Sequence, residues 1–205
     1  MTFRHGMPAR LAAVVLLASL ASSLAWAGSP GTQALENSTL PEPDGYAMSA
    51  PQAGAADDKM EARIEARVAT NCSNAWQVFT DFDGMPRFLP GMELSKVVSR
   101  EAGHVTLLQR GRHQYGIFSK DYQSERELTM SEPVLIESRS LPRDELAIAS
   151  TTRFTPTQQG GCVIASSATI ELPRWVPGAT AESFMKSLAA AQMQAMLVEV
   201  RRRYR

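Results

Sequence analysis

Residues 180–203 read TAESFMKSLAAAQMQAMLVEVRRR, and this segment predicts the longest helix of the chain. Ala, Met, Leu, Gln and Glu dominate the segment, and all five are good helix formers. Thr180 suits the N-cap position, and Glu182 places negative charge in the first turn, where the helix dipole favours it. More than half of the helix surface is apolar, which suits a helix held by a curved sheet rather than one laid on a flat sheet.

Two polar residues, Gln192 and Glu199, interrupt the apolar side of this helix. One interpretation is that their long side chains reach solvent from the helix edge. The other interpretation is that they face an internal cavity with room for a ligand.

A basic cluster closes the chain at Arg201, Arg202, Arg203 and Arg205. Positive charge at the C-terminus of a helix is stabilising by up to about 1 kcal/mol. The alternative is peripheral contact with an anionic membrane surface, to which each basic residue would add about 1 kcal/mol.

The N-terminus has the charged, apolar and small-residue regions of a secretory signal peptide. Basic residues precede an apolar run, residues 11–27, which ends in Ala25-Trp26-Ala27 and is followed by Gly28. We expect cleavage of residues 1–27 near Ala27-Gly28 and a periplasmic or secreted protein. The alternative is an anchor left uncleaved in the membrane.

Beyond the signal peptide, composition divides the chain in two. Residues 28–58 are rich in Ala, Gly, Pro and Ser, so we expect a disordered leader that is dispensable for folding. Residues 59–205 have the size of one domain. The chain has equal numbers of basic and acidic residues, and loss of Arg4 and Arg10 with the signal peptide leaves a slight acidic excess. That balance gives no support for nucleic-acid binding.

The order of predicted elements indicates an α+β fold. Residues 61–70 alternate between charged and apolar or small side chains, as in a half-buried strand. Two short helices follow and end at Pro90, with Asp81 and Asp83 placed as caps between them. Residues 92–172 then read as six strands joined by short turns. This order matches the helix-grip fold, a seven-stranded curved antiparallel sheet wrapped around a long C-terminal helix, with two short helices after the first strand.

The residues around the two short helices resemble a known family. Residues 75–92 read AWQVFTDFDGMPRFLPGM and are similar to the START-like polyketide cyclase and coenzyme Q-binding family of the SRPBCC superfamily, which includes the birch-pollen-allergen fold. The segment FLP at 88–90 is the most characteristic part, and Gln109 and Gly111 fit the same pattern. The quinone-binding members work inside cells or mitochondria, whereas this chain carries an export signal.

The resemblance implies a hydrophobic cavity between the sheet and the long helix, able to hold a lipid, quinone, isoprenoid or polyketide-like molecule. Given that fold, alternation places polar residues among apolar ones on the inward faces, because the opposite register would bury several charged residues. We therefore expect a ligand that is largely apolar with a polar end; the alternative is that these polar residues sit at strand ends near solvent. The candidate lining residues are Gln109, His113, Tyr122, Arg126, Ser150, Thr152, Phe154, Ser166, Phe184, Leu188, Gln192 and Met196.

The sequence carries no motif for catalysis. It lacks a nucleophile elbow, a phosphate-cradling glycine loop and any His or Cys pair with metal-ligand spacing, so we expect no cofactor and no metal. Only His113 is a candidate base, and a structural role in its strand is the alternative. A binding or carrier protein is therefore favoured over a cyclase or aromatase-type enzyme and over a protein-interaction module with a vestigial cavity.

The chain has two cysteines, Cys72 directly after the first predicted strand and Cys162 at the start of the last. In the helix-grip fold that the resemblance implies, these two strands are antiparallel neighbours, so the end of one lies beside the start of the other. Together with export to a compartment where disulfides persist, this predicts a Cys72–Cys162 disulfide. The alternative is two buried free thiols.

Overall fold

The structure is a computed structural model that describes residues 45–53, 59–115, 118–142, 144, 147–171 and 178–205. The predicted signal peptide lies outside these residues. In the described part of the chain, one antiparallel sheet has the strand order β1-β2-β8-β7-β6-β5-β4-β3. The strands are β1 (Tyr46–Ala53), β2 (Lys59–Val68), β3 (Met92–Glu101), β4 (His104–Tyr115), β5 (Phe118–Ser131), β6 (Leu135–Ser140), β7 (Ile148–Pro156) and β8 (Cys162–Glu171).

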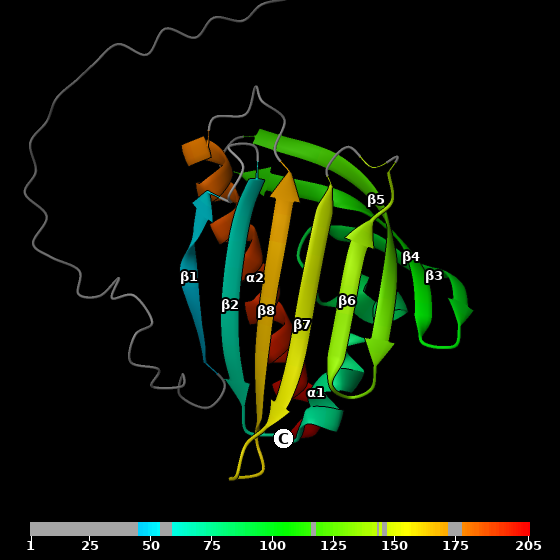
Figure 1. The fold of residues 1–205 in the computed structure, drawn as a ribbon, viewed down its shortest axis with the longest axis vertical. Helices are drawn as coiled ribbons and strands as arrows, with labels where there is room; N and C mark the ends of the chain where they lie inside the picture. The colour runs from blue at the N-terminus through cyan, green and yellow to red at the C-terminus, as the bar shows by residue number, and fades with distance from the viewer. Residues whose placement is uncertain (1–44, 54–58, 116–117, 143, 145–146, 172–177) are drawn as a thin grey trace, which may run out of the picture. The chain divides into compact units, whose positions relative to one another are not determined.

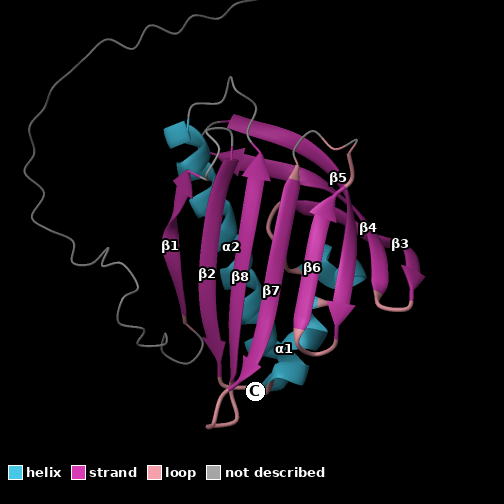
Figure 2. Cartoon of the chain, in the orientation of Figure 1, coloured by secondary structure: helices cyan, strands magenta, loops and turns pink. Residues whose placement is uncertain are grey.

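The long helix α2 (Gly178–Tyr204) lies on one side of this sheet, which curves around it (Figure 1). We call the sheet surface that faces α2 the inner face. The short helices α1 (Cys72–Phe79) and η1 (Phe82–Arg87) follow β2, and the C-terminus lies beside α1 (Figure 2). The structure therefore confirms the α+β class and the helix-grip arrangement.

The strand β1 was not expected, and it makes the sheet eight-stranded rather than seven-stranded. It pairs antiparallel along β2, and its half-buried Tyr46 and Met48 pack against the core. Small residues and Pro51 give this segment a weak strand pattern, but the edge of β2 offers backbone hydrogen bonds to any extended segment. The prediction of a disordered leader over residues 28–58 is wrong for β1.

The two short helices begin at side-chain caps. Asn71 caps α1 by accepting a hydrogen bond from a backbone N–H in the first turn, at 2.9 Å. Asp81 caps η1 by accepting from the Gly84 N–H at 3.2 Å. Asp83 instead accepts from the Val97 N–H on β3 at 3.2 Å, so it joins η1 to the sheet. Both carboxylates thus have structural partners.

Apolar side chains form two separate clusters on the inner face. The larger cluster, called here the main core, joins α1, η1 and the C-terminal half of α2 to β2, β4, β5, β7 and β8. The smaller cluster contains Met60, Ala62 and Met185, with Ile170 packed against it. The fully inaccessible members of the main core are Ala66, Val68, Ala75, Val78, Cys162, Ile164 and Leu197.

An ion-pair cluster ties the end of α2 to the segment between α1 and η1. Arg203 Nη2 donates to Asp81 Oδ2 at 2.6 Å, and Arg203 Nε donates to Glu199 Oε1 at 2.7 Å. Arg202 Nε donates to Glu199 Oε2 at 2.7 Å. Glu199 is only 5% exposed and both its carboxylate oxygens accept from arginines, so its role is in this ion-pair cluster rather than at solvent. Hydrogen bonds from Arg202, opposed by burial and assisted by Arg203, lower the pKa of Glu199 to about 2.

This cluster accounts for two members of the C-terminal arginine group, Arg202 and Arg203. Peripheral membrane contact stays a prediction and would depend chiefly on Arg201 and Arg205. No helix in the described ranges combines the length and apolar character needed to cross a membrane.

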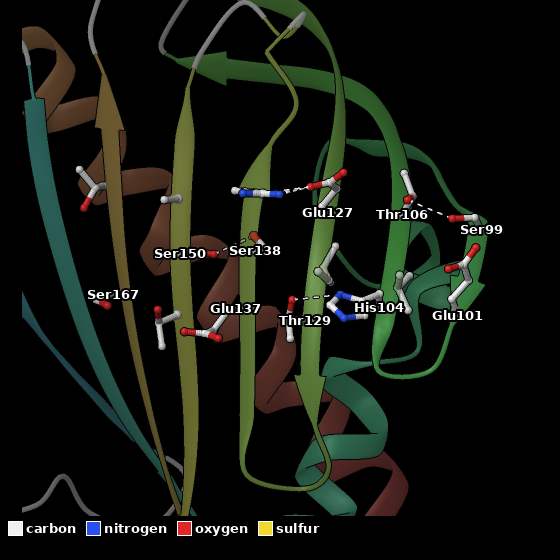
Figure 3. Close-up of a pocket in the computed structure, with 16 residues that line it drawn as sticks. Ser99, Glu101, His104, Thr106, Glu127, Thr129, Glu137, Ser138, Ser150 and Ser167 are labelled. Carbon is white, nitrogen blue, oxygen red and sulfur yellow. Dashed lines mark hydrogen bonds and ion pairs between the residues drawn. The ribbon is translucent and has the colours of Figure 1, made fainter.

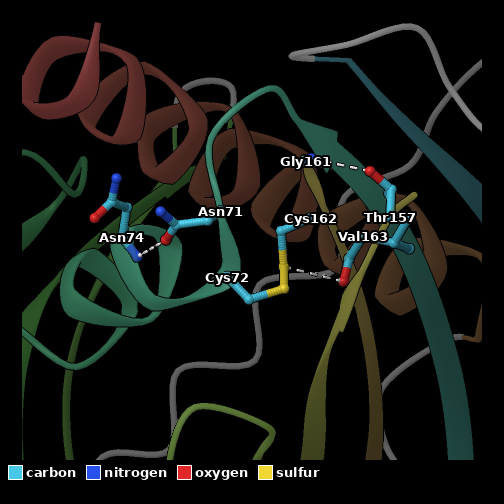
Figure 4. Close-up of a disulfide and its surroundings, with 7 residues drawn as sticks. All are labelled: Asn71, Cys72, Asn74, Thr157, Gly161, Cys162 and Val163. Carbon is cyan, nitrogen blue, oxygen red and sulfur yellow. Dashed lines mark hydrogen bonds between the residues drawn. A yellow bond between two sulfur atoms is a disulfide. The ribbon is translucent and has the colours of Figure 1, made fainter. Parts of the chain in front are cut away.

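The predicted disulfide is confirmed (Figure 4). Cys72 at the start of α1 and Cys162 at the start of β8 are bonded, with their Cα atoms 4.9 Å apart. Val68 of β2 pairs directly with Cys162, which brings the chain after β2 beside the start of β8. The bond therefore links α1 to the centre of the sheet.

Candidate ligand-binding face

The register of the sheet brings the predicted lining residues of four strands, β4, β5, β7 and β8, onto one face. Gln109 of β4 pairs with Ser124 of β5, and Leu107 pairs with Arg126, so these side chains point to the same side. Leu107 and Gln109 are buried, which identifies that side as the inner face. The inward faces assigned from alternation on β4, β5, β7 and β8 are therefore confirmed.

Two pairs of hydroxyl groups cross the middle of the inner face. Ser138 Oγ and Ser150 Oγ lie 3.0 Å apart between β6 and β7. Thr152 Oγ1 and Ser166 Oγ lie 3.0 Å apart between β7 and β8. All four residues are half-buried. Each pair satisfies one hydrogen bond internally and leaves further donor and acceptor capacity on the inner face.

Ser138 is not among the residues that the sequence predicts to line the site. The sequence predicts a strand over residues 134–140, observed as β6, but does not indicate which of its side chains point inward. Its pairing with Ser150, which alternation had placed inward, is the signal that could have found it.

An aromatic group lies where β4 and β5 approach α2. The rings of His113 and Tyr122 stack with centroids 4.1 Å apart and planes 6° apart. Phe184 of α2 meets the His113 ring edge-on at 5.8 Å. Burial lowers the pKa of His113 below 6.5, and the positive charge of Arg126 lowers it further. Burial raises the pKa of Tyr122 above 10, so both rings are neutral at pH 7.

Arg126 lies on the same strand and the same face as Tyr122. Its side chain is half-buried, and its Nε atom is inaccessible to solvent and has no hydrogen-bond partner. Burial lowers the pKa of Arg126, while the negative charge of Asp144 and the Tyr122 hydroxyl oppose that change. A guanidinium remains charged even so, which makes this a cation on the inner face.

Two of the predicted lining residues, Phe154 and Met196, belong to the main core, and a third, Gln109, is buried against its member Met85. Phe154 packs edge-on against Trp76 and Phe79, with centroids 5.3 and 5.4 Å away. Gln109 donates weakly to Ser95 Oγ at 3.4 Å. Met196 of α2 is buried in the same cluster.

The other α2 candidates, Phe184, Leu188 and Gln192, are half-buried. The half-buried set on the sheet consists of His113, Tyr122, Arg126, Ser150, Thr152 and Ser166. These residues remain partly accessible although they face a helix, whereas the buried ones pack closely. The half-buried residues are therefore the part of the predicted lining that is available to a ligand.

A separate hollow of about 770 Å³ lies on the opposite side of the sheet (Figure 3). Glu127, Glu137, Arg139 and Thr151 border it from strand positions that alternate with the inner-face residues. Of the predicted lining residues, only Ser150 touches it. Its carboxylates and hydroxyls do not fit a largely apolar ligand, because sites for such ligands are mostly lined by apolar side chains.

The chemistry available on the inner face favours binding. Among the described residues, no group of three His, Cys, Asp or Glu side chains is arranged to hold a metal ion. His113 contacts the rings of Tyr122 and Phe184, and no described carboxylate hydrogen-bonds to it to orient it as a base. Among the side chains that the structure describes, the face offers the Arg126 cation, several hydroxyls and aromatic surface.

Comparison with protein families gives one match, which covers most of the described domain. The family described as polyketide cyclase, dehydrase and lipid transport matches residues 59–204. A search of the curated proteins finds no match.

Solved structures with the same fold include enzymes and lipid-transfer proteins. The Zhui aromatase/cyclase from Streptomyces sp. R1128 superposes with a TM-score of 0.62 at 13% identity, covering 72% of this chain and 96% of the other. A START superfamily protein from Mycobacterium smegmatis gives 0.60 at 12% identity, covering 69% and 97%. A STAR-related lipid transfer protein from Xanthomonas axonopodis gives 0.57 at 11% identity, covering 77% and 99%. At these identities the likeness concerns the fold alone.

Proposed function

We propose that this chain, which belongs to the polyketide cyclase, dehydrase and lipid transport family, binds or carries a largely apolar small molecule with a polar end. The observation that carries the proposal is the composition of the inner face. Half-buried hydroxyl, aromatic and cationic side chains lie there alongside two apolar clusters that do not merge. A protein without a ligand site gains stability by filling such a face with apolar side chains, because unpaired polar groups are costly to bury.

Binding is proposed rather than catalysis for a chemical reason. A cyclase needs an acid or base held in position against its substrate. Among the described residues, His113 is the only histidine on the inner face, and its neighbours there are rings rather than an orienting carboxylate. The cation and hydroxyls suit recognition of a polar group, which requires no proton transfer.

We further propose that the protein acts after export. The support is the signal-peptide pattern of residues 1–27, together with a disulfide of the kind that persists in oxidising compartments. Cell fractionation of the full chain, compared with a version lacking residues 1–27, tests this. Equal amounts of both versions in the cytosol would contradict it.

Blocking the inner face tests the binding proposal. We expect Ser166→Trp to weaken binding of the neutral fluorescent probe N-phenyl-1-naphthylamine at least about tenfold, because the indole would occupy the space beside Thr152. The matched control is Ser167→Trp, which adds the same side chain at the next residue, where it is exposed on the opposite side of the sheet.

Both variants should keep a cooperative thermal transition. Equal probe binding by wild type and both variants would refute the inner-face site, and no probe binding by folded wild type would refute the function. Native mass spectrometry of protein purified from its own host, followed by lipid extraction, would identify the natural ligand.

A further inference from the structure

Arg126 is a cation on the inner face to which no described carboxylate forms a hydrogen bond or ion pair. It pairs across the sheet with Leu107 on one side and Ser140 on the other. Leu107 is 3% exposed, and Leu128, two residues along the same face, is 5% exposed. The base of the Arg126 side chain therefore lies among apolar groups and a hydroxyl rather than among carboxylates.

No described residue forms a side-chain hydrogen bond or ion pair with the Arg126 guanidinium, and its inaccessible Nε has no partner at all. The charge of Asp144 acts on it through space. Both Asp144 carboxylate oxygens share the Glu125 backbone N–H at 3.1 Å, and no described hydrogen bond or ion pair joins that carboxylate to Arg126. A half-buried cation with an inaccessible, unpaired N–H is unfavourable, and binding of an anion beside it lowers that cost.

Two other arginines of this sheet, Arg112 and Arg139, have guanidinium groups with carboxylate partners. Arg112, on the outer side of β4, donates from Nε to Asp121 at 2.6 Å. Arg139, on the outer side of β6, donates from Nε to Glu127 at 2.9 Å. Both are exposed, where an ion pair contributes little. Exposed Arg112 and Arg139 thus each have a carboxylate partner, whereas half-buried Arg126 has none among the described residues.

We propose that Arg126 binds the anionic head group of the ligand, and that the ligand is an amphiphile with a carboxylate. This inference rests on the proposed function and names the chemical class of its substrate. A guanidinium accommodates a carboxylate through two parallel N–H···O bonds, which are stronger than neutral hydrogen bonds.

The experiment compares an acid with a matching neutral amphiphile. Dodecanoate and dodecanol are used as competitors for N-phenyl-1-naphthylamine at pH 7.5, below their aggregation concentrations. We expect wild type to bind dodecanoate about tenfold more tightly than dodecanol, as one charge-assisted pair supplies. Arg126→Met should reduce this ratio to about one or less, and Arg126→Lys should retain part of it.

The control variant is Arg110→Met, which removes the same charge from an exposed position on the other side of β4. It should leave the ratio unchanged, which separates a local contact from the general effect of net charge. Equal affinity of wild type for the two competitors would overturn the inference, as would a ratio that Arg126→Met leaves unchanged. The wild-type ratio is measured without any variant, so equal affinities for dodecanoate and dodecanol would overturn the inference even if Arg126→Met does not fold. Displacement of the neutral probe by dodecanol without an acid preference would leave the proposed function standing and overturn only this inference.

Discussion

The buried carboxylate of Glu199 provides the sharpest test of the folded structure. It accepts hydrogen bonds from Arg202 and Arg203. Arg203 also donates a hydrogen bond to Asp81, which follows α1 in the chain. Replacing Glu199 by Gln removes the negative charge at the centre of the cluster while keeping the side-chain shape. Arg203 then keeps Asp81 as its only carboxylate partner among the described residues.

The magnitude follows from the pKa. Folding lowers the pKa of Glu199 from 4.5 to about 2, chiefly through the Arg202 hydrogen bonds. At about 1.4 kcal/mol per pH unit this corresponds to at most about 3.4 kcal/mol. The Arg202 side chain is 67% exposed, and solvent screens its part of the interaction. We therefore expect Glu199→Gln to lower the free energy of unfolding by about 2 kcal/mol at pH 7.

The pH dependence has a definite sign. Because the folded pKa is lower than the unfolded pKa, the ionised carboxylate stabilises the protein fully above pH 4.5. That stabilisation is lost as the pH falls through the window from 4.5 to about 2. The difference between wild type and Glu199→Gln should accordingly shrink across this window.

Urea unfolding at a series of pH values from 7 to 2, followed by circular dichroism, measures both effects. Glu182→Gln is the matched control, because Glu182 is exposed on the same helix and should change the free energy of unfolding by less than about 0.5 kcal/mol. A Glu199→Gln difference that stays constant between pH 7 and pH 2 would refute the reasoning, since the stabilisation would then not depend on the carboxylate charge.

Three further predictions concern the fold. Reduction of the Cys72–Cys162 disulfide should lower stability by about 4 kcal/mol, because it opens a loop of 90 residues, and adding reductant to Cys72→Ser should have no further effect on the urea midpoint. Deletion of residues 46–53 should lower the melting temperature by several degrees, since it strips the β2 edge and removes apolar cover from the core; an unchanged melting temperature would show that β1 contributes nothing. Gly91→Ala should destabilise by more than about 2 kcal/mol, because Gly91 has φ +74° and a Cβ there would collide with the Arg112 carbonyl oxygen, and near-wild-type unfolding would contradict that geometry.

Much of the fold could be predicted because it depends on local patterns. Strict alternation on β2 and the assigned inward faces of β4, β5, β7 and β8 follow from the period of a strand, since the wrong register buries charge. The long segment of good helix formers predicted α2, and the position of Cys72 and Cys162 at adjoining strand ends predicted the disulfide once the fold was inferred. The segment that became β1 has no such pattern, because its pairing depends on the free edge of β2 rather than on its own side chains.

The sequence alone determined which residues face inward, because side-chain direction in a strand is a property of the chain itself. Only the tertiary structure decided which of them meet. The stacking of His113 on Tyr122 depends on the register of β4 against β5, and the pairing of Arg203 with Asp81 joins residues far apart in the chain. Arg126 was among the inward residues from the start, but its lack of a described partner could not be read from the sequence. That property depends on every neighbouring element, because electrostatic satisfaction is decided by distances in space rather than by order along the chain.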